Sequence, residues 1–155
     1  MRASDWIIQW LEEKGVETVF VVSGGGAIFL DDAIAQAKSL KYVCCHHEQA
    51  CAMAAEGYAR VTGKLGVAIV TSGPGATNAI TGCAGAWADH VPMLIISGQA
   101  FLRHTIGSSG LRQKGVQEIN ITDIVRPITK AALVVDTADA INDDLESAYA
   151  QAMNG

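Results

Sequence analysis

The sequence is poor in charged and aromatic side chains, which make up 17% and 6% of its 155 residues. It has no cluster of lysine and arginine, and its net charge of −5 argues against a nucleic-acid partner. No apolar run reaches the roughly 18 residues that a membrane-spanning helix needs. Met1–Asp5 leads into an amphipathic segment and does not resemble a signal peptide. We therefore predict a cytoplasmic protein with no nucleic-acid and no membrane partner.

The four cysteines have neither CxxC spacing nor the pattern of a disulfide framework. Cys44 and Cys45 precede His46 and His47, and these residue types are common zinc ligands. Neighbouring residues on a strand point to opposite faces, so four consecutive side chains cannot easily surround one ion. We predict no metal site and interpret the cysteines as buried, reduced thiols.

Hydrophobic residues and glycine are abundant: 50% of the chain is hydrophobic, and 16 residues are glycine. This mix is typical of α/β proteins, whose buried strands are continuous apolar runs. The predicted strands are 18–22, 42–44, 66–71, 92–97 and 131–135, and the predicted helices are 4–14, 27–38, 48–61, 74–88 and 138–152. Their alternation predicts a three-layer α/β fold, with helices on both faces of a mostly parallel sheet.

Two parts of the chain do not follow this alternation. Residues 100–123 have no clear periodicity, and we expect them to cover the carboxyl ends of the strands. The sequence ends where a helix ends and a further strand is expected. We therefore expect residues 1–155 to be one domain, a fragment that lacks its last strand and any downstream domains.

Two glycine-rich loops, Gly24–Gly26 and Ser72–Gly75, each follow a predicted strand and precede a helix. Ligands of open α/β sheets bind at this carboxyl edge, where glycine allows close approach to the backbone. Neither loop fits the GxGxxG or GxxxxGK[ST] pattern. Ordinary tight turns explain such glycines about as well as a ligand does.

Glu48 opens a predicted helix whose residues are mostly small, from Gln49 to Arg60. One interpretation is an acid in the first turn, stabilised by the helix dipole and without another role. The other is a buried acid that faces a ligand. The local pattern alone favours the first. Glu56 lies four residues before Arg60, which predicts an ion pair on the helix surface.

An ordered set of motifs resembles the N-terminal pyrimidine-binding domain of thiamine-diphosphate enzymes, most closely the acetolactate synthase group. The motifs are GVETVF at 15–20, HEQ at 47–49, AAEGYARVTG at 54–63, TSGPGATN at 71–78, SGQ at 97–99, QE at 117–118 and RPITK at 126–130. No single motif is specific, but their order is, and the resemblance runs from about residue 4 to the end. It reverses the preference at Glu48 in favour of a ligand-facing acid.

The resemblance assigns roles to particular residues. In the family the glutamate that matches Glu48 hydrogen-bonds the pyrimidine nitrogen N1′ as a protonated carboxyl, a form that burial favours. Glu48 and Gln117 are the implied catalytic residues. The implied cofactor-binding residues are Gly25, Gly26, Glu48, Ser72, Gly73, Pro74, Gly75 and Asn78. Of these, Gly25 and Gly26 approach the thiazolium and substrate side together with Gln117, and Gln99 is a weaker candidate.

The family's GDG motif for diphosphate and Mg²⁺ does not occur in this sequence. The resemblance therefore implies that another domain or chain holds those groups, that this chain alone is inactive, and that FAD binds, if at all, only elsewhere in the full-length protein. It further implies a homodimer or larger homo-oligomer that decarboxylates a small 2-oxo acid and transfers the acyl unit. Two alternatives stay open: the small subunit of a split 2-oxo acid decarboxylase, and a non-catalytic α/β nucleotide-binding or interaction module.

Overall fold

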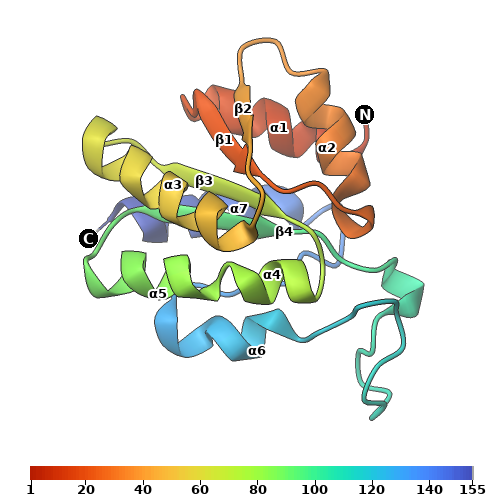
Figure 1. Ribbon diagram of the computed structural model, residues 1–155. Coiled ribbons are helices and arrows are strands. Elements are labelled where there is room, and N and C mark those ends of the chain that lie inside the picture. The colour runs from red at the N-terminus through yellow and green to blue at the C-terminus, as the bar shows by residue number, and fades with distance from the viewer. Residues whose placement is uncertain (155) are drawn as a thin grey trace.

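Four parallel strands form the central sheet of the computed structural model, which describes residues 1–154 (Figure 1). The strands are β1 (Thr18–Val21), β2 (Lys41–Cys44), β3 (Gly66–Val70) and β4 (Met93–Ser97). Their order in the sheet is β2-β1-β3-β4, and every neighbouring pair is parallel. The carboxyl ends of all four strands therefore meet at one edge, as the sequence predicts.

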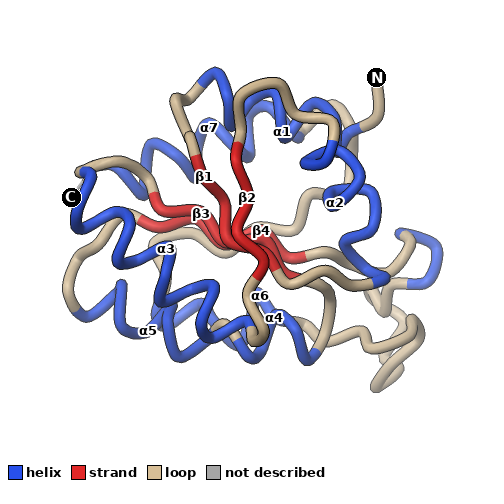
Figure 2. Tube along the Cα trace, turned by 45° about the horizontal axis from the view of Figure 1, so that its top comes forward, coloured by secondary structure: helices blue, strands red, loops and turns tan. Residues whose placement is uncertain are grey.

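Helices cover both faces of this sheet (Figure 2). The helical elements are α1 (Ala3–Glu13), η1 (Gly25–Ala27), α2 (Ile28–Ala35), α3 (Glu48–Thr62), α4 (Pro74–Asn78), α5 (Ile80–Ala88), η2 (Leu102–His104), α6 (Ile121–Val125), η3 (Arg126–Ile128) and α7 (Ile141–Met153). The predicted three-layer α/β class is confirmed. None of the helices described within residues 1–154 is long and apolar enough to cross a membrane.

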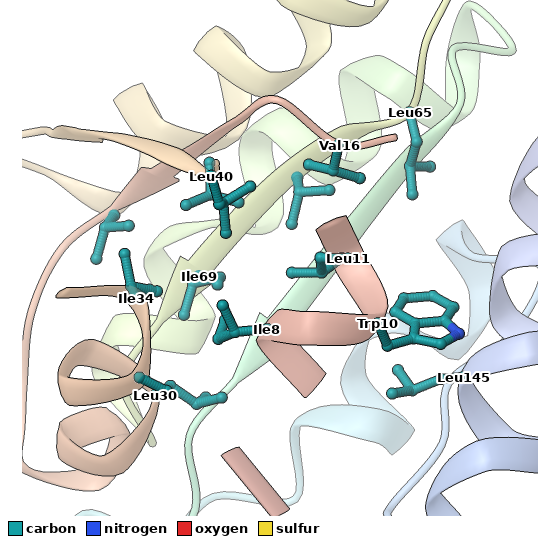
Figure 3. Packing of buried hydrophobic residues seen from close by; sticks show 14 of the residues in the cluster. Ile8, Trp10, Leu11, Val16, Leu30, Ile34, Leu40, Leu65, Ile69 and Leu145 are labelled. Carbon is teal, nitrogen blue, oxygen red and sulfur yellow. The ribbon is translucent and has the colours of Figure 1, made fainter. Parts of the chain in front are cut away.

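The strand β3 is buried along its whole length and contributes to the core on both faces. Ile69 packs in the cluster with α1, α2 and α7, where Ile8, Leu11 and Leu145 also lie (Figure 3). On the other face the core side chains are smaller, because the clusters there contain Cys51, Ala52, Ala55, Ala68, Val70, Ala76 and Ala79. Val67 and Ile69 of β3 thus face one side of the sheet, and Ala68 and Val70 face the other, because successive side chains of a strand point to opposite faces.

The small side chains allow α3 to lie very close to its neighbours. A β-carbon on Gly66 of β3 would overlap the backbone carbonyl of Ala55. One turn earlier on the helix, a β-carbon on Gly82 of α5 would overlap the β-carbon of Ala52. The helix is thus in direct contact with both β3 and α5, and its first residue, Glu48, is placed firmly at the carboxyl edge.

The predicted strand at 131–135 is wrong. These residues have no regular structure and no partner strand within residues 1–154. Leu133, Val134 and Val135 are exposed rather than buried. A strand is stabilised by ladder hydrogen bonds with a neighbour, so apolar β-branched residues alone do not form one.

Several helix boundaries also differ from the prediction. The helix α1 begins at Ala3 after an Arg2 cap, one residue before the predicted start, and Asp5 accepts a hydrogen bond from the Arg2 backbone N–H at 3.1 Å, as in a capping box. The predicted helix 74–88 is divided at Ala79 into α4 and α5. The last helix begins at Ile141, after a turn in which Thr137 Oγ1 accepts from the Ala140 N–H.

Glu12 of α1 joins the core helix to the turn before β2. Its Oε1 accepts from the Ser39 N–H at 2.6 Å, the Ser39 hydroxyl at 2.8 Å and the Leu40 N–H at 3.0 Å. The hydrogen bond from the Ser39 backbone is the main cause that lowers the pKa of Glu12, although desolvation acts against it. The carboxylate form of Glu12 therefore stabilises the folded chain.

We expect Glu12→Gln to lower the free energy of unfolding by about 1–2 kcal/mol at pH 7. Because the folded-state pKa lies below the unfolded value of about 4.3, this stability is present above that value and is lost as pH falls through the folded pKa. Urea denaturation between pH 7 and 3 measures the difference. Glu13→Gln, one residue along and exposed, is the matched control. If the loss of unfolding free energy in Glu12→Gln is as large at pH 3 as at pH 7, the prediction is wrong.

Candidate functional site

Glu48 is a buried carboxylate at the start of α3, with 8% of its surface exposed. The preceding residue, His47, caps the helix, because its Nδ1 accepts from the Gln49 N–H at 3.1 Å. Asn78 at the end of α4 donates its Nδ2–H to Glu48 Oε2 at 2.9 Å. The other oxygen, Oε1, makes no hydrogen bond with the described residues 1–154 and lies 3.2 Å from where a β-carbon on Gly75 would be. One oxygen of Glu48 is thus fixed, and the other faces the turn before α4.

The turn Ser72–Gly75 leads from β3 into α4. Gly73 has φ 60° and ψ −119°, a conformation that side chains with a β-carbon rarely adopt. A β-carbon there would also overlap the backbone carbonyl of Gln117. At Gly75 it would lie 2.6 Å from Thr71 Cγ2. Pro74, at the first position of α4, is exposed. Close packing within the protein therefore requires glycine at 73 and 75, whatever ligand lies against the turn.

The loop Gly24–Gly26 lies against this turn. The Gly26 N–H donates to Thr71 Oγ1 at 3.1 Å, and a β-carbon on Gly26 would overlap Ser72 Oγ. Gly25, in contrast, is exposed and has no atom within 4 Å of its β-carbon position. Of the two glycines in this loop that are predicted to bind the cofactor, only Gly25 has free space beside its α-carbon, whereas Gly26 packs on Ser72.

Gln117 reaches the same edge from the long segment between β4 and α6. Its side chain is exposed, and its φ of 56° is left-handed, which is uncommon for a residue other than glycine. Gln99, in contrast, accepts a hydrogen bond from its neighbour, the Ala100 N–H, at 2.8 Å. The structure therefore brings Glu48, Asn78 and the Ser72–Gly75 turn together with Gln117, and it gives Gln99 a local contact.

The cysteines near Glu48 differ in their exposure. Cys51 and Cys83 are buried as expected, but Cys44 is exposed, because every residue of β2, a strand at the sheet edge, is exposed. Burial raises the pKa of the Cys51 thiol, and its hydrogen bond with Cys45 and the charge of Glu48 act in the same direction. Cys51 is thus an unreactive thiol that forms part of the wall beside Glu48.

Other charged residues have structural contacts. No group of three or more His, Cys, Asp or Glu side chains is placed to hold a metal ion within the part of the chain that the structure describes. The predicted ion pair is confirmed, because Arg60 lies 2.6 Å from Glu56 Oε1, and Arg60 also contacts Asp89.

Two acids near the edge have positions that the sequence does not reveal. Asp31 of α2 accepts from the Gly24 N–H at 3.3 Å, and burial raises its pKa. Glu118, next to Gln117, is buried within its own loop. For Glu118, the QE motif at 117–118 is the only feature of the sequence that points to this position. For Asp31, nothing in the sequence distinguishes it from the neighbouring Asp32.

A family model described as "Thiamine pyrophosphate enzyme, N-terminal TPP binding domain" matches residues 1–124. The chain belongs to this family. Its relatives include the acetolactate synthase large subunit of Haemophilus influenzae, 41% identical over 155 residues, which are all of this chain and 26% of the relative. The chloroplastic acetolactate synthase of Arabidopsis thaliana is 40% identical over 154 residues, 99% of this chain and 22% of the relative.

A third relative, the acetolactate synthase large subunit of Lactococcus lactis subsp. lactis, is 42% identical over 137 residues, which cover 88% of this chain and 23% of that protein. The chain thus spans about a quarter of the length of the relatives it matches. Within the thiamine pyrophosphate family, the carboxyl edge described above lies in the N-terminal cofactor-binding domain.

Proposed function

We propose that this domain is the pyrimidine-binding half of a thiamine-diphosphate-dependent enzyme of the acetolactate synthase-like group, which decarboxylates a small 2-oxo acid and transfers the acyl unit. The observation that carries the proposal is Glu48: a buried carboxylate with one oxygen fixed by Asn78 and the other facing a glycine turn. The printed names of the relatives support the choice of group.

The residues present fit a flat, nitrogen-containing ring. Glu48 Oε1 retains its hydrogen-bonding capacity for a ring nitrogen, while Asn78 prevents the carboxyl group from turning away. Gly75 brings its backbone close to the same place, because the position of a β-carbon there lies 3.2 Å from Glu48 Oε1. The Gln117 carbonyl lies against Gly73, and Gly25 is next to Gly26, which packs on Ser72. We place the thiazolium and the substrate beside Gly25 and Gln117.

Thiamine diphosphate, when bound, supplies the electron sink for cleavage of the bond to the carboxylate. Glu48 holds a proton on its carboxyl group at the ring nitrogen. Cys51, Ala52 and Ala55 fill the core beneath α3, and Cys51 lies close enough to Glu48 for the charge of the carboxylate to affect it. Gln117 orients the substrate through its exposed amide.

The remainder of the assembly belongs to the same proposal. A second chain or domain holds the diphosphate and Mg²⁺, and FAD, where it is used, binds outside this domain. The complete site then forms between subunits of a homodimer or larger homo-oligomer in the cytoplasm. The absence of a GDG motif from residues 1–155 supports this division of the site.

Calorimetry with thiamine diphosphate and Mg²⁺ tests the proposal. We expect binding at least about tenfold tighter when this domain is combined with the domain that carries the diphosphate site than when it is alone, because the charged group then has its partners. If neither preparation binds, the cofactor assignment is wrong, and the non-catalytic module is favoured. A reading frame that continues past residue 155 into a GDG motif rules out the split small subunit.

A further inference from the structure

Glu118 is a buried carboxylate inside the loop that joins η2 to α6, with 7% of its surface exposed. Its Oε1 accepts from the Ile106 N–H, and its Oε2 accepts from the N–H groups of Lys114 at 3.2 Å and Gly115 at 2.9 Å. The donors lie three, four and twelve residues before Glu118. One side chain therefore connects the two arms of this loop.

The loop closes tightly around this carboxylate. A β-carbon on Gly115 would lie 2.6 Å from Ala100 Cβ and 2.9 Å from the His104 carbonyl oxygen. Gln113 donates its Nε2–H to the Gly115 carbonyl at 3.1 Å. Apolar packing contributes little here, because Leu111 and Val116 are exposed. Polar contacts to Glu118 and Gly115 thus replace a hydrophobic core in this segment.

Gln117 precedes Glu118 and has the left-handed φ of 56°. A residue with a β-carbon keeps this conformation only where its surroundings fix it. Its carbonyl lies where a β-carbon on Gly73 would be, so the loop rests directly on the turn beside Glu48. The contacts of Glu118 on one side and Gly73 on the other are the restraints on Gln117.

We propose that Glu118 is a positioning residue that anchors the loop 104–118 and so holds Gln117 against the Ser72–Gly75 turn. The anchoring stands on the geometry alone. The consequence for substrate binding rests on the function proposed above, because it takes Gln117 to face the substrate.

The charge of Glu118 agrees with this role. Desolvation acts to raise its pKa, but the hydrogen bonds from Gly115, Ile106 and Lys114, together with the positive charge of Lys114, outweigh it and lower the pKa. The carboxylate form is the one that accepts all three bonds.

Amide hydrogen exchange on the 155-residue chain, without cofactor, tests the anchoring. Glutamine at 118 turns one acceptor oxygen into an N–H₂ donor, so at least one of the three bonds is lost. We expect Glu118→Gln to lower the protection factors of Ile106, Lys114 and Gly115 at least tenfold, while Val67 in β3 keeps its protection. Glu13→Gln, the same change at an exposed position of α1, leaves all of these values unchanged. If the protection factors of Ile106, Lys114 and Gly115 are unchanged in Glu118→Gln, the proposal is overturned.

The unmutated chain provides a second measurement that does not depend on how the variant folds. Because the pKa of Glu118 is lowered, protection of the loop amides is expected above the ordinary glutamate value and is lost as pH falls through the folded value, with Val67 still protected. In Glu118→Gln this step is absent. Loop protection that stays constant down to the acid unfolding of β3 overturns the proposal.

The consequence for the site is measured in the complete enzyme. We expect Glu118→Gln to raise KM for the 2-oxo acid at least tenfold and to leave the Kd of thiamine diphosphate within twofold of the unmutated value. An unchanged KM in a variant with a loosened loop overturns the role in positioning. Failure of the unmutated enzyme to bind thiamine diphosphate contradicts the proposed function instead and leaves the anchoring result intact.

Discussion

The Glu48→Gln variant of the complete enzyme is expected to retain less than about one hundredth of the turnover number, the usual loss when an acid–base group is removed. Glutamine has nearly the same shape and still accepts from Asn78, so the contact seen at 2.9 Å is kept. It cannot hold an acidic proton at a ring nitrogen. The loss therefore falls on kcat, whereas binding of the cofactor and the fold change little.

Glu56→Gln is the matched control for this experiment, because Glu56 lies two turns further along α3 and pairs with Arg60. It makes the same change from a carboxyl group to an amide on the same helix, away from the glycine turn. We expect its kcat to stay within twofold of the unmutated enzyme, with circular dichroism confirming the fold of both variants. Near-normal activity of Glu48→Gln would remove Glu48 from the mechanism.

Gly66→Ala is expected to reduce the free energy of unfolding by about 3 kcal/mol, the upper end of the usual cost of overpacking. The added methyl group meets the backbone carbonyl of Ala55, which a change of rotamer cannot move. Either β3 or α3 has to shift, and β3 is buried along its whole length. Urea denaturation of the 155-residue chain measures this loss.

Gly57→Ala provides the opposite case on the same helix. Gly57 is exposed in the middle of α3 and has no atom within 4 Å of its β-carbon position. Alanine there is expected to increase stability by about 0.5–1 kcal/mol, because it restricts the unfolded chain and favours the helix. Equal effects of the two alanine substitutions contradict the close approach of α3 to β3.

The parts of the fold that the sequence predicts correctly are those in which local pattern and burial agree. The apolar runs 18–22, 66–71 and 92–97 contain the strands β1, β3 and β4, and each of these pairs with a neighbour in the sheet. The run at 131–135 is also apolar, but it has no neighbouring strand among residues 1–154, because apolar composition carries no information about pairing. The division of 74–88 at Ala79 likewise leaves no sign in a stretch of good helix formers.

The candidate site is only partly predictable for a similar reason. Ordered motifs point to Glu48 and to the Ser72–Gly75 turn, but the hydrogen bond from Asn78 joins residues on two separate helices. The sequence also does not distinguish Gly25, which has an open side, from Gly26, which packs on Ser72. The contacts of Glu118 leave no sign in the sequence, because its partners are backbone N–H groups, which every residue except proline has.

The contacts that assemble this edge are separated widely along the chain: 30 residues between Glu48 and Asn78, and 45 between Gly26 and Thr71. Such non-local contacts form late in folding, because each requires a long loop to close first. A chain with only its first two strands in place therefore has no site, and a ligand of this edge selects molecules whose sheet is complete. By mass action, its binding is expected to stabilise the whole domain and to raise the yield of refolding from denaturant.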